Sequence, residues 1–187
     1  CLLLVLALAP LQILAEEWPG MDAFGLPEEL PTPPFTDVSV HAWYYPYVRV
    51  QHTLGLMAGT GNDAFSPNGT VPLTQGLTVA VRVYEKYWGI PDTSAELGSP
   101  WYTYYINRAR EYGILPQTLE GVSVFRAATR AELAEILSRS LPEVELEPIH
   151  QVDALPDYTS QDLYWNGVIT LYLSLIHISE PTRQAEI

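Results

Sequence analysis

An internal repeat constrains what this chain of 187 residues can fold into more than any other feature. Trp43 recurs as Trp101 and Gly55 as Gly113, both 58 positions further along the chain. A second stretch recurs after 57 positions, with VPLTQGL in the first copy matching ATRAELA in the second. Copies of this length are too small to bury a core alone, so the fixed period predicts small units that stack on their neighbours.

Apolar residues recur at helical spacing within each copy, which predicts two helices joined by a loop and a mainly α fold. The expected core stripe of the first helix is Trp43, Tyr47, Val50 and Leu54. Gly55 suits the left-handed position that ends a helix, and Phe65 is the one large apolar residue in the turn-rich loop that follows. Helices are expected near 42–54, 72–88, 100–112 and 129–141.

The N-terminal residues predict export from the cell. Residues 1–15 open with CLLLVLALA and give way to acidic sequence after Ala15, where cleavage of a secretory signal peptide is expected. The apolar run is shorter than the roughly 20 residues that a transmembrane helix needs, and a buried helix is the alternative. Residues 16–34 hold five prolines, two glycines and five acidic residues, so they are expected to form an extended linker without regular structure.

The charge balance excludes several classes of partner. The chain has 22 Asp and Glu against 9 Lys and Arg, for a formal net charge of -13. Nucleic acids and anionic membrane surfaces bind basic footprints, so neither is an expected partner of the mature protein. An anionic ligand must instead be held by a few well-placed cations. Cys1 is the single cysteine, which leaves no disulfide and no Cys/His zinc pattern, and no metal or other cofactor is expected.

Motifs of catalysis are missing from the sequence. It contains no HExxH, no GxSxG and no glycine-rich phosphate loop. His41, His52 and His150 are scattered, and the pair Glu28-Glu29 lies in the expected linker. The sequence therefore predicts no enzymatic activity for this part of the protein, and it leaves open a catalytic domain further along a longer parent chain.

The order of the motifs resembles the S-layer homology repeat. The matching residues are Phe35-x-Asp37-Val38, Trp43, Gly55-Leu56-x-x-Gly59 and Phe65-x-Pro67 in the first copy and Thr129-Arg130-Ala131-Glu132 in the second. The resemblance implies tandem helix–loop–helix repeats that pack as a three-repeat pseudo-trimer, at 35–92, 93–142 and, truncated, 149–172. Grooves between repeats of this family bind secondary cell-wall polysaccharide, which often carries pyruvate ketals. A secreted protein held at the cell wall or S-layer surface is therefore expected.

The same resemblance implies where the polymer binds. Thr129 and Glu132 have the spacing of a capping box, which leaves Arg130 in the first turn beside free N–H groups and the positive end of the helix dipole. A guanidinium there can hold a pyruvate carboxylate bidentately. The expected polymer-binding residues are Arg130, Glu132, Thr129, Trp101, Trp43 and Asp37. Tryptophans would stack on sugar rings. The alternatives are a motif that only caps the helix and tryptophans that belong to the core.

Each copy departs from the family pattern. The first has PLTQ at 72–75 in place of TRAE, so its groove is expected to be weak or silent. The second has a shortened loop at 117–126, and the third, which opens near Asp153, lacks a second helix. One site remains, built around Arg130. Two other functions stay open: the anchor portion of a larger surface enzyme such as a polysaccharide hydrolase, and an interaction module whose grooves bind peptide.

The C-terminal residues 173–187 follow a different pattern. Residues 173–183, LSLIHISEPTR, closely resemble the frame translation of a transposase adapter used in preparing sequencing libraries, and residues 184–187 are expected to be index-derived. The stretch begins where the third repeat should have continued towards its glycine. A genuine amphipathic ending is the alternative. His177 and Arg183 are accordingly expected to have no function.

Overall fold

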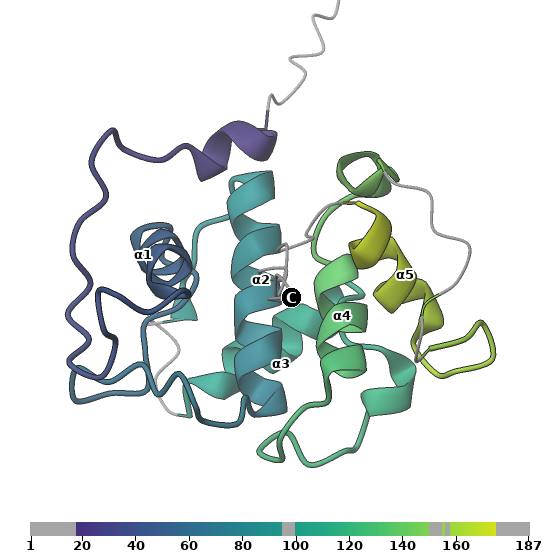
Figure 1. Ribbon diagram of the computed structural model, residues 1–187. Helices are drawn as coiled ribbons and strands as arrows, with labels where there is room; N and C mark the ends of the chain where they lie inside the picture. The colour runs from purple at the N-terminus through teal and green to yellow at the C-terminus, as the bar shows by residue number, and fades with distance from the viewer. Residues whose placement is uncertain (1–17, 95–99, 150–154, 156–157, 175–187) are drawn as a thin grey trace, which may run out of the picture.

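The computed structural model describes residues 18–94, 100–149, 155 and 158–174, which form a mainly helical fold (Figure 1). No β-strand occurs among these residues, where only isolated bridges pair extended segments. The expected mainly α class is therefore confirmed. The helices are α1 Tyr45–Thr53, α2 Leu73–Trp88, α3 Tyr102–Glu111, α4 Arg130–Ser138 and α5 Trp165–Leu173, with 3-10 turns η1 Gly20–Phe24, η3 Gln117–Leu119 and η4 Glu143–Leu146.

The four predicted helices are all present, as α1 to α4, and their ends lie within three residues of the expected positions. Gly55 and Gly113 follow α1 and α3 with φ angles of 72° and 71°. This left-handed conformation is one that glycine adopts without steric cost, and it ends helices. Equivalent glycines at the repeat offset therefore end equivalent helices, as the sequence period predicts.

The predicted core stripe of α1 is wrong in part. Val48 is the buried side chain of this helix at 4% exposure, whereas Trp43 and Tyr47 are 67% and 46% exposed. Val48 packs with Phe35 in a small cluster that Phe65 helps to cover. The helix begins two residues after Trp43, so helical spacing does not govern that side chain. Phe65, in the loop after α1, packs against the cluster around Val48, whereas Val50 and Leu54 are only half-buried.

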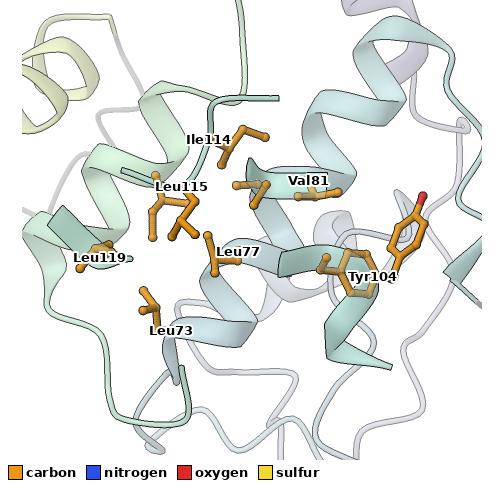
Figure 2. Packing of buried hydrophobic residues seen from close by; sticks show 11 residues of the cluster. Leu73, Leu77, Val81, Tyr104, Ile114, Leu115 and Leu119 are labelled. Atoms are coloured by element: carbon orange, nitrogen blue, oxygen red, sulfur yellow. The ribbon is translucent and has the colours of Figure 1, made fainter. Parts of the chain in front are cut away.

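The main hydrophobic core is shared between the first two repeats (Figure 2). α2 packs against both α3 and α4, and α4 also packs against α5 (Figure 1). The buried side chains of this core are Leu73, Leu77, Ala80, Val81, Tyr104, Tyr105, Ala109, Ile114, Leu115, Leu119 and Ile136. Neither repeat closes this core alone, as expected of small units that depend on their neighbours.

A short antiparallel pairing sets the starts of α2 and α4 side by side. Pro72 and Ala127, which precede the two helices, form an isolated bridge. The Leu73 amide donates to the Arg126 carbonyl at 3.0 Å as part of the same pairing. Because α2 begins one residue and α4 three residues beyond this bridge, their first turns lie next to each other.

Two helical glycines allow neighbouring helices to approach closely. A Cβ placed at Gly76 of α2 would lie 2.4 Å from Cδ2 of Leu133 in α4. A Cβ at Gly167 of α5 would lie 2.4 Å from the Cα of Glu135 in α4. Glu135 Oε2 also accepts a hydrogen bond from the Gly167 amide at 3.1 Å. The first helix of the third copy is thus seated on α4 by a backbone approach that requires glycine.

The N-terminal segment is more regular than the sequence predicts. Gly20–Phe24 forms a 3-10 turn where no regular structure was expected, and this turn packs on α2. The ring centroids of Trp18 and Trp88 lie 5.0 Å apart in an edge-to-face contact. Further along, Arg49 of α1 donates to the Pro31 carbonyl at 3.3 Å. Aromatic packing and the contact with the Pro31 carbonyl thus order a proline-rich segment for which no regular structure was expected.

Several predictions fall outside the described residues. They are the signal peptide at 1–15, the opening of the third copy at Asp153, His150, and the C-terminal tail from residue 175. Within the described part, a hollow of about 690 Å³ lies between α4, η4 and α5, and Val144 at its edge is 66% exposed. The hollow therefore lies beside the helix of the incomplete third copy.

A buried carboxylate lies between α2 and α3. Glu85 is 2% exposed, and its Oε1 accepts from the Tyr104 hydroxyl at 2.7 Å and from the Tyr112 hydroxyl at 3.3 Å. Arg108 Nε lies 3.9 Å from the same oxygen, whereas Oε2 is buried and has no hydrogen-bond partner in the described residues. Burial raises the pKa of Glu85 above its ordinary value, against the opposing effect of the tyrosine and arginine contacts.

We expect Gly167→Ala to lower the free energy of unfolding by about 1–3 kcal/mol, because the new methyl group meets the α4 backbone, which cannot turn aside. Without this clash, replacing glycine by alanine would stabilise the helix. Urea denaturation measures the free energy of unfolding. Asn166→Ala, at the exposed neighbouring position, is the matched control and should stay within about 0.5 kcal/mol of wild type. Unchanged stability of Gly167→Ala would show that α5 is not seated on α4.

We expect Glu85→Gln to unfold at a higher urea concentration than wild type at pH 7. The folded state raises the pKa of Glu85, so the stability supplied by its protonated form is present at low pH and is lost as the pH rises through the folded pKa. Glutamine stays neutral, so the gap between variant and wild type should narrow as the pH falls. A variant less stable than wild type at pH 7 would mean that Arg108 and the tyrosines outweigh burial.

Candidate functional site

α4 begins with the predicted capping box. Thr129 precedes the helix with an extended backbone, at φ -78° and ψ 160°. Its hydroxyl accepts a hydrogen bond from the Glu132 amide at 3.2 Å, and Glu132 Oε2 accepts one from the Thr129 amide at 2.8 Å. Two backbone donors at the helix start are satisfied in this way. The prediction that these two residues cap the helix is confirmed.

The cap includes an arginine that the sequence alone did not point to. Arg126 donates from NH1 to Glu132 Oε2 at 2.9 Å and from NH2 to Oε1 at 2.6 Å. These bonds, with that from the Thr129 amide, lower the pKa of Glu132 to about 2. Arg126 lies in the shortened loop, three residues before the motif, where no helical spacing relates it to Glu132. The sequence therefore carried little signal for this pair.

Arg130 occupies the first turn of α4, and its side chain is exposed. It makes no hydrogen bond or ion pair to any residue that the structure describes. The acidic residue nearest to it in the sequence of the helix, Glu132, is hydrogen-bonded to Thr129 and Arg126. A guanidinium without an internal partner, beside the positive end of a capped helix, is the geometry that the predicted anion contact needs.

Trp101 lines a groove of about 390 Å³ between the first and second repeats. It is 53% exposed and meets Tyr105 edge to face at a centroid distance of 6.1 Å. The alternative that this tryptophan belongs to the core is therefore wrong. The rest of the lining comes from residues 56–60, from Phe65 and from one face of α2. The cation of this groove is Arg82, and Arg130 is not among its lining residues.

The guanidinium of Arg82 is fixed in the wall of the groove. Its Nε and NH2 donate to the Tyr105 hydroxyl at 3.1 and 2.9 Å, and its NH1 donates to the Leu56 carbonyl at 3.3 Å. Asp92 Oδ2 lies 3.7 Å from Nε and offsets part of the charge. The groove is thus polar on one side, at Arg82, and aromatic on another, at Trp101.

A repeat signal for Arg82 exists in the sequence. It recurs as Arg139, 57 positions later. Arg139 NH1 donates to the Gly113 carbonyl at 3.3 Å, as Arg82 donates to the Leu56 carbonyl at the same distance. Each arginine therefore binds the chain just beyond the first helix of its own repeat, and this shared structural role explains the recurrence.

Asp37 and Trp43 lie in the first repeat, apart from the α4 cap. Asp37 accepts hydrogen bonds from the Phe65 and Ser66 amides at 2.8 and 2.7 Å, which lower the pKa of its carboxyl. It thereby holds the loop whose Phe65 lines the groove beside Trp101. Trp43 is 67% exposed against Tyr47 and is also not a core residue. Neither residue contacts Arg130 in the described structure.

The start of α2 offers a physical reason why the first copy is expected to bind the polymer weakly or not at all. Its first amides are occupied, because Leu73 and Thr74 donate to the carbonyls of Arg126 and Val124 at 3.0 and 2.9 Å. Pro72 has no amide hydrogen. These backbone bonds replace a side-chain cap at α2 and leave fewer free donors for an anion than a helix start open to solvent has.

The described residues contain neither a membrane-spanning helix nor a metal-binding cluster. Within that part of the chain, no helix is long and apolar enough to cross a membrane. Among the same residues, no group of three or more His, Cys, Asp or Glu side chains is arranged to hold a metal ion.

Comparison with known proteins gives one match. Residues 34–71, which include α1 and the loop that Asp37 holds, match the family model of the S-layer homology domain. No curated protein and no solved structure matches the chain significantly. The resemblance of the first copy to this family is therefore confirmed.

We expect Thr129→Ala to lower the free energy of unfolding by about 1 kcal/mol, because the Glu132 amide loses its acceptor. Arg130→Ala should leave the free energy of unfolding within about 0.5 kcal/mol of wild type, since the side chain is exposed and has no partner among the described residues. Thermal melting of both variants compares their stability losses and so distinguishes the structural role of Thr129 from that of Arg130. A large loss of stability in Arg130→Ala would contradict this separation.

Proposed function

We propose that this chain anchors a secreted protein to the bacterial cell wall by binding an acidic secondary wall polysaccharide, on the ground that residues 34–71 match the S-layer homology domain. Domains of this family are generally cell-surface anchoring modules. The observation that carries the finer proposal is Arg130, a cation without an internal partner in the described structure, at the start of a capped helix.

The chemistry of Arg130 suits a carboxylate on a sugar. A guanidinium presents parallel N–H donors that match the two oxygens of a carboxylate, such as that of a pyruvate ketal. The helix dipole adds favourable potential at the same place. Because the whole chain has a net charge of -13, diffuse attraction to an acidic polymer is unfavourable. Affinity is therefore expected to concentrate on this cation.

The groove beside Trp101 supports a role in holding sugar rings. Its volume of about 390 Å³ lies within the range of small-molecule sites, roughly 300–1,000 Å³. The exposed indole offers an apolar face, and Arg82 and Thr60 offer polar groups in the same lining. We assign this groove to the sugar backbone of the polymer, and Arg130 to its acidic substituent.

Binding without catalysis fits the carboxylates of the described structure. Five carboxyl groups of the described residues have a displaced pKa, and all five bind neighbouring groups of the fold. Glu132 has Arg126, Asp37 has two loop amides, Glu85 has Tyr104 and Tyr112, Asp92 has Tyr105 and Ser94, and Asp162 has Thr159. Each of these contacts is a structural role, and none presents the carboxyl group to a substrate for proton transfer. We therefore propose a binding module and not an enzyme.

We expect Arg130→Ala to bind purified pyruvylated wall polysaccharide at least tenfold more weakly than wild type in calorimetric titration. The lost contact is a charge-assisted hydrogen bond, which contributes roughly 1.5–3 kcal/mol. Against polymer stripped of its pyruvate groups, the two proteins should bind alike, since the carboxylate partner is gone.

Two control variants accompany this test. Arg110→Ala removes the same charge from α3, where Arg110 pairs with Glu120 at 2.9 Å, and should bind as wild type does. Leu73→Ala opens the buried core at the first-repeat equivalent of Arg130 and should lower stability without changing the affinity of the folded protein. If folded Arg130→Ala binds the polymer with wild-type affinity, the TRAE motif caps the helix and does not contact the polymer.

A further inference from the structure

Arg126 joins the two equivalent helix starts through different parts of the residue. Its carbonyl accepts from the Leu73 amide at 3.0 Å and so belongs to the pairing beside α2. Its side chain points to α4, where NH1 donates a hydrogen bond to Glu132 Oε2 at 2.9 Å and NH2 donates one to Oε1 at 2.6 Å. NH1 also donates to the Ala127 carbonyl at 2.8 Å, which fixes the guanidinium in place.

The capping box does not need this arginine to form. Thr129 and Glu132 exchange their two hydrogen bonds without it, and Glu132 uses only Oε2 towards the Thr129 amide. The backbone pairing with Leu73 involves only the Arg126 carbonyl, which every residue type provides. A substitution of the side chain therefore leaves both the cap and the bridge with their bonds.

The Arg126 side chain instead changes the charge at the helix start. Glu132 and Arg130 lie in the same first turn of α4, so an unpaired Glu132 carboxylate would offset the charge that Arg130 presents to an anion. With Arg126 on Glu132, the three side chains sum to one positive charge. The ion pair is partly buried, with Glu132 at 9% and Arg126 at 35% side-chain exposure, so solvent screens it only in part.

We infer that Arg126 is a positioning residue for polymer binding: it neutralises Glu132 and so leaves Arg130 as an unopposed cation for the acidic group of the polysaccharide. This inference rests on the proposed function, because it concerns the affinity of the Arg130 site. It adds a residue outside the TRAE motif and assigns the shortened loop of the second repeat a role, which is to bring Arg126 within reach of Glu132.

The test uses a charge-compensated pair of substitutions in the whole chain. Arg126→Met keeps much of the side-chain length and should bind pyruvylated wall polysaccharide roughly three- to tenfold more weakly, as expected for one unscreened carboxylate near the bound anion. Glu132→Gln keeps an acceptor for the Thr129 amide and should bind more tightly than wild type. The double variant has the wild-type charge at the helix start and should recover most of the affinity.

A pH profile supplies a readout that a purely structural role would not change. In wild type the pKa of Glu132 is about 2, so its charge is constant between pH 4 and pH 6. In Arg126→Met the carboxyl should titrate nearer the ordinary value of about 4.3. The affinity of that variant should therefore recover relative to wild type as the pH falls towards 4. Carbon-13 NMR of the Glu132 carboxyl measures the titration directly.

The results of these binding measurements distinguish a failure of this inference from a failure of the proposed function on which it rests. Wild-type affinity in Arg126→Met, with weak binding in Arg130→Ala, would overturn the inference and leave the proposed function standing. Weak binding in Arg126→Met without recovery in the double variant would also overturn it, since the loss would then come from structure and not from charge. Wild-type affinity in Arg130→Ala would remove the proposed site itself. Arg126→Lys, which keeps the charge, should bind nearly as wild type does.

Discussion

The pairing of two equivalent helix starts holds the remaining elements in place. The bridge between Pro72 and Ala127 joins the segments that lead into α2 and α4, so the two helices leave it side by side. Gly76 then admits the Leu133 side chain, and the core shared with α3 closes around the pair. α5 adds to the outer side of α4 through the close approach at Gly167 (Figure 1). Each unit is stable because its neighbour covers it.

The same pairing makes the two helix starts chemically different. At α2 the first amides are taken by carbonyls of the second repeat, and no side-chain cap forms. At α4 the cap is made by Thr129 and Glu132, with Arg126 as a third member, and Arg130 has no partner in the described part of the chain. A sequence repeat therefore leads to one candidate site for an anion, because Leu73 stands where the second copy has Arg130 and the first amides of α2 are bound to carbonyls of the second repeat.

The elements that sequence predicted well depend on local spacing. The helices, the glycines that end them and the Thr129–Glu132 cap all follow from residues within a few positions of each other. What sequence missed depends on chain segments meeting in space. The loop that returns over Val48 decides which face of α1 is buried, and the contact of Trp18 with Trp88 orders the N-terminal turn. The Arg126–Glu132 pair likewise forms only once the shortened loop is folded.

The most direct test of the account is the location of bound polymer on the folded protein. Titration of nitrogen-15-labelled protein with a pyruvylated disaccharide unit of the wall polysaccharide reports this by NMR. The account predicts saturable shifts of the Arg130 side-chain Nε signal and of the first-turn amides of α4, with the Trp101 indole signal moving alongside them. Saturable shifts confined to other surfaces, with the α4 start unmoved, would contradict it.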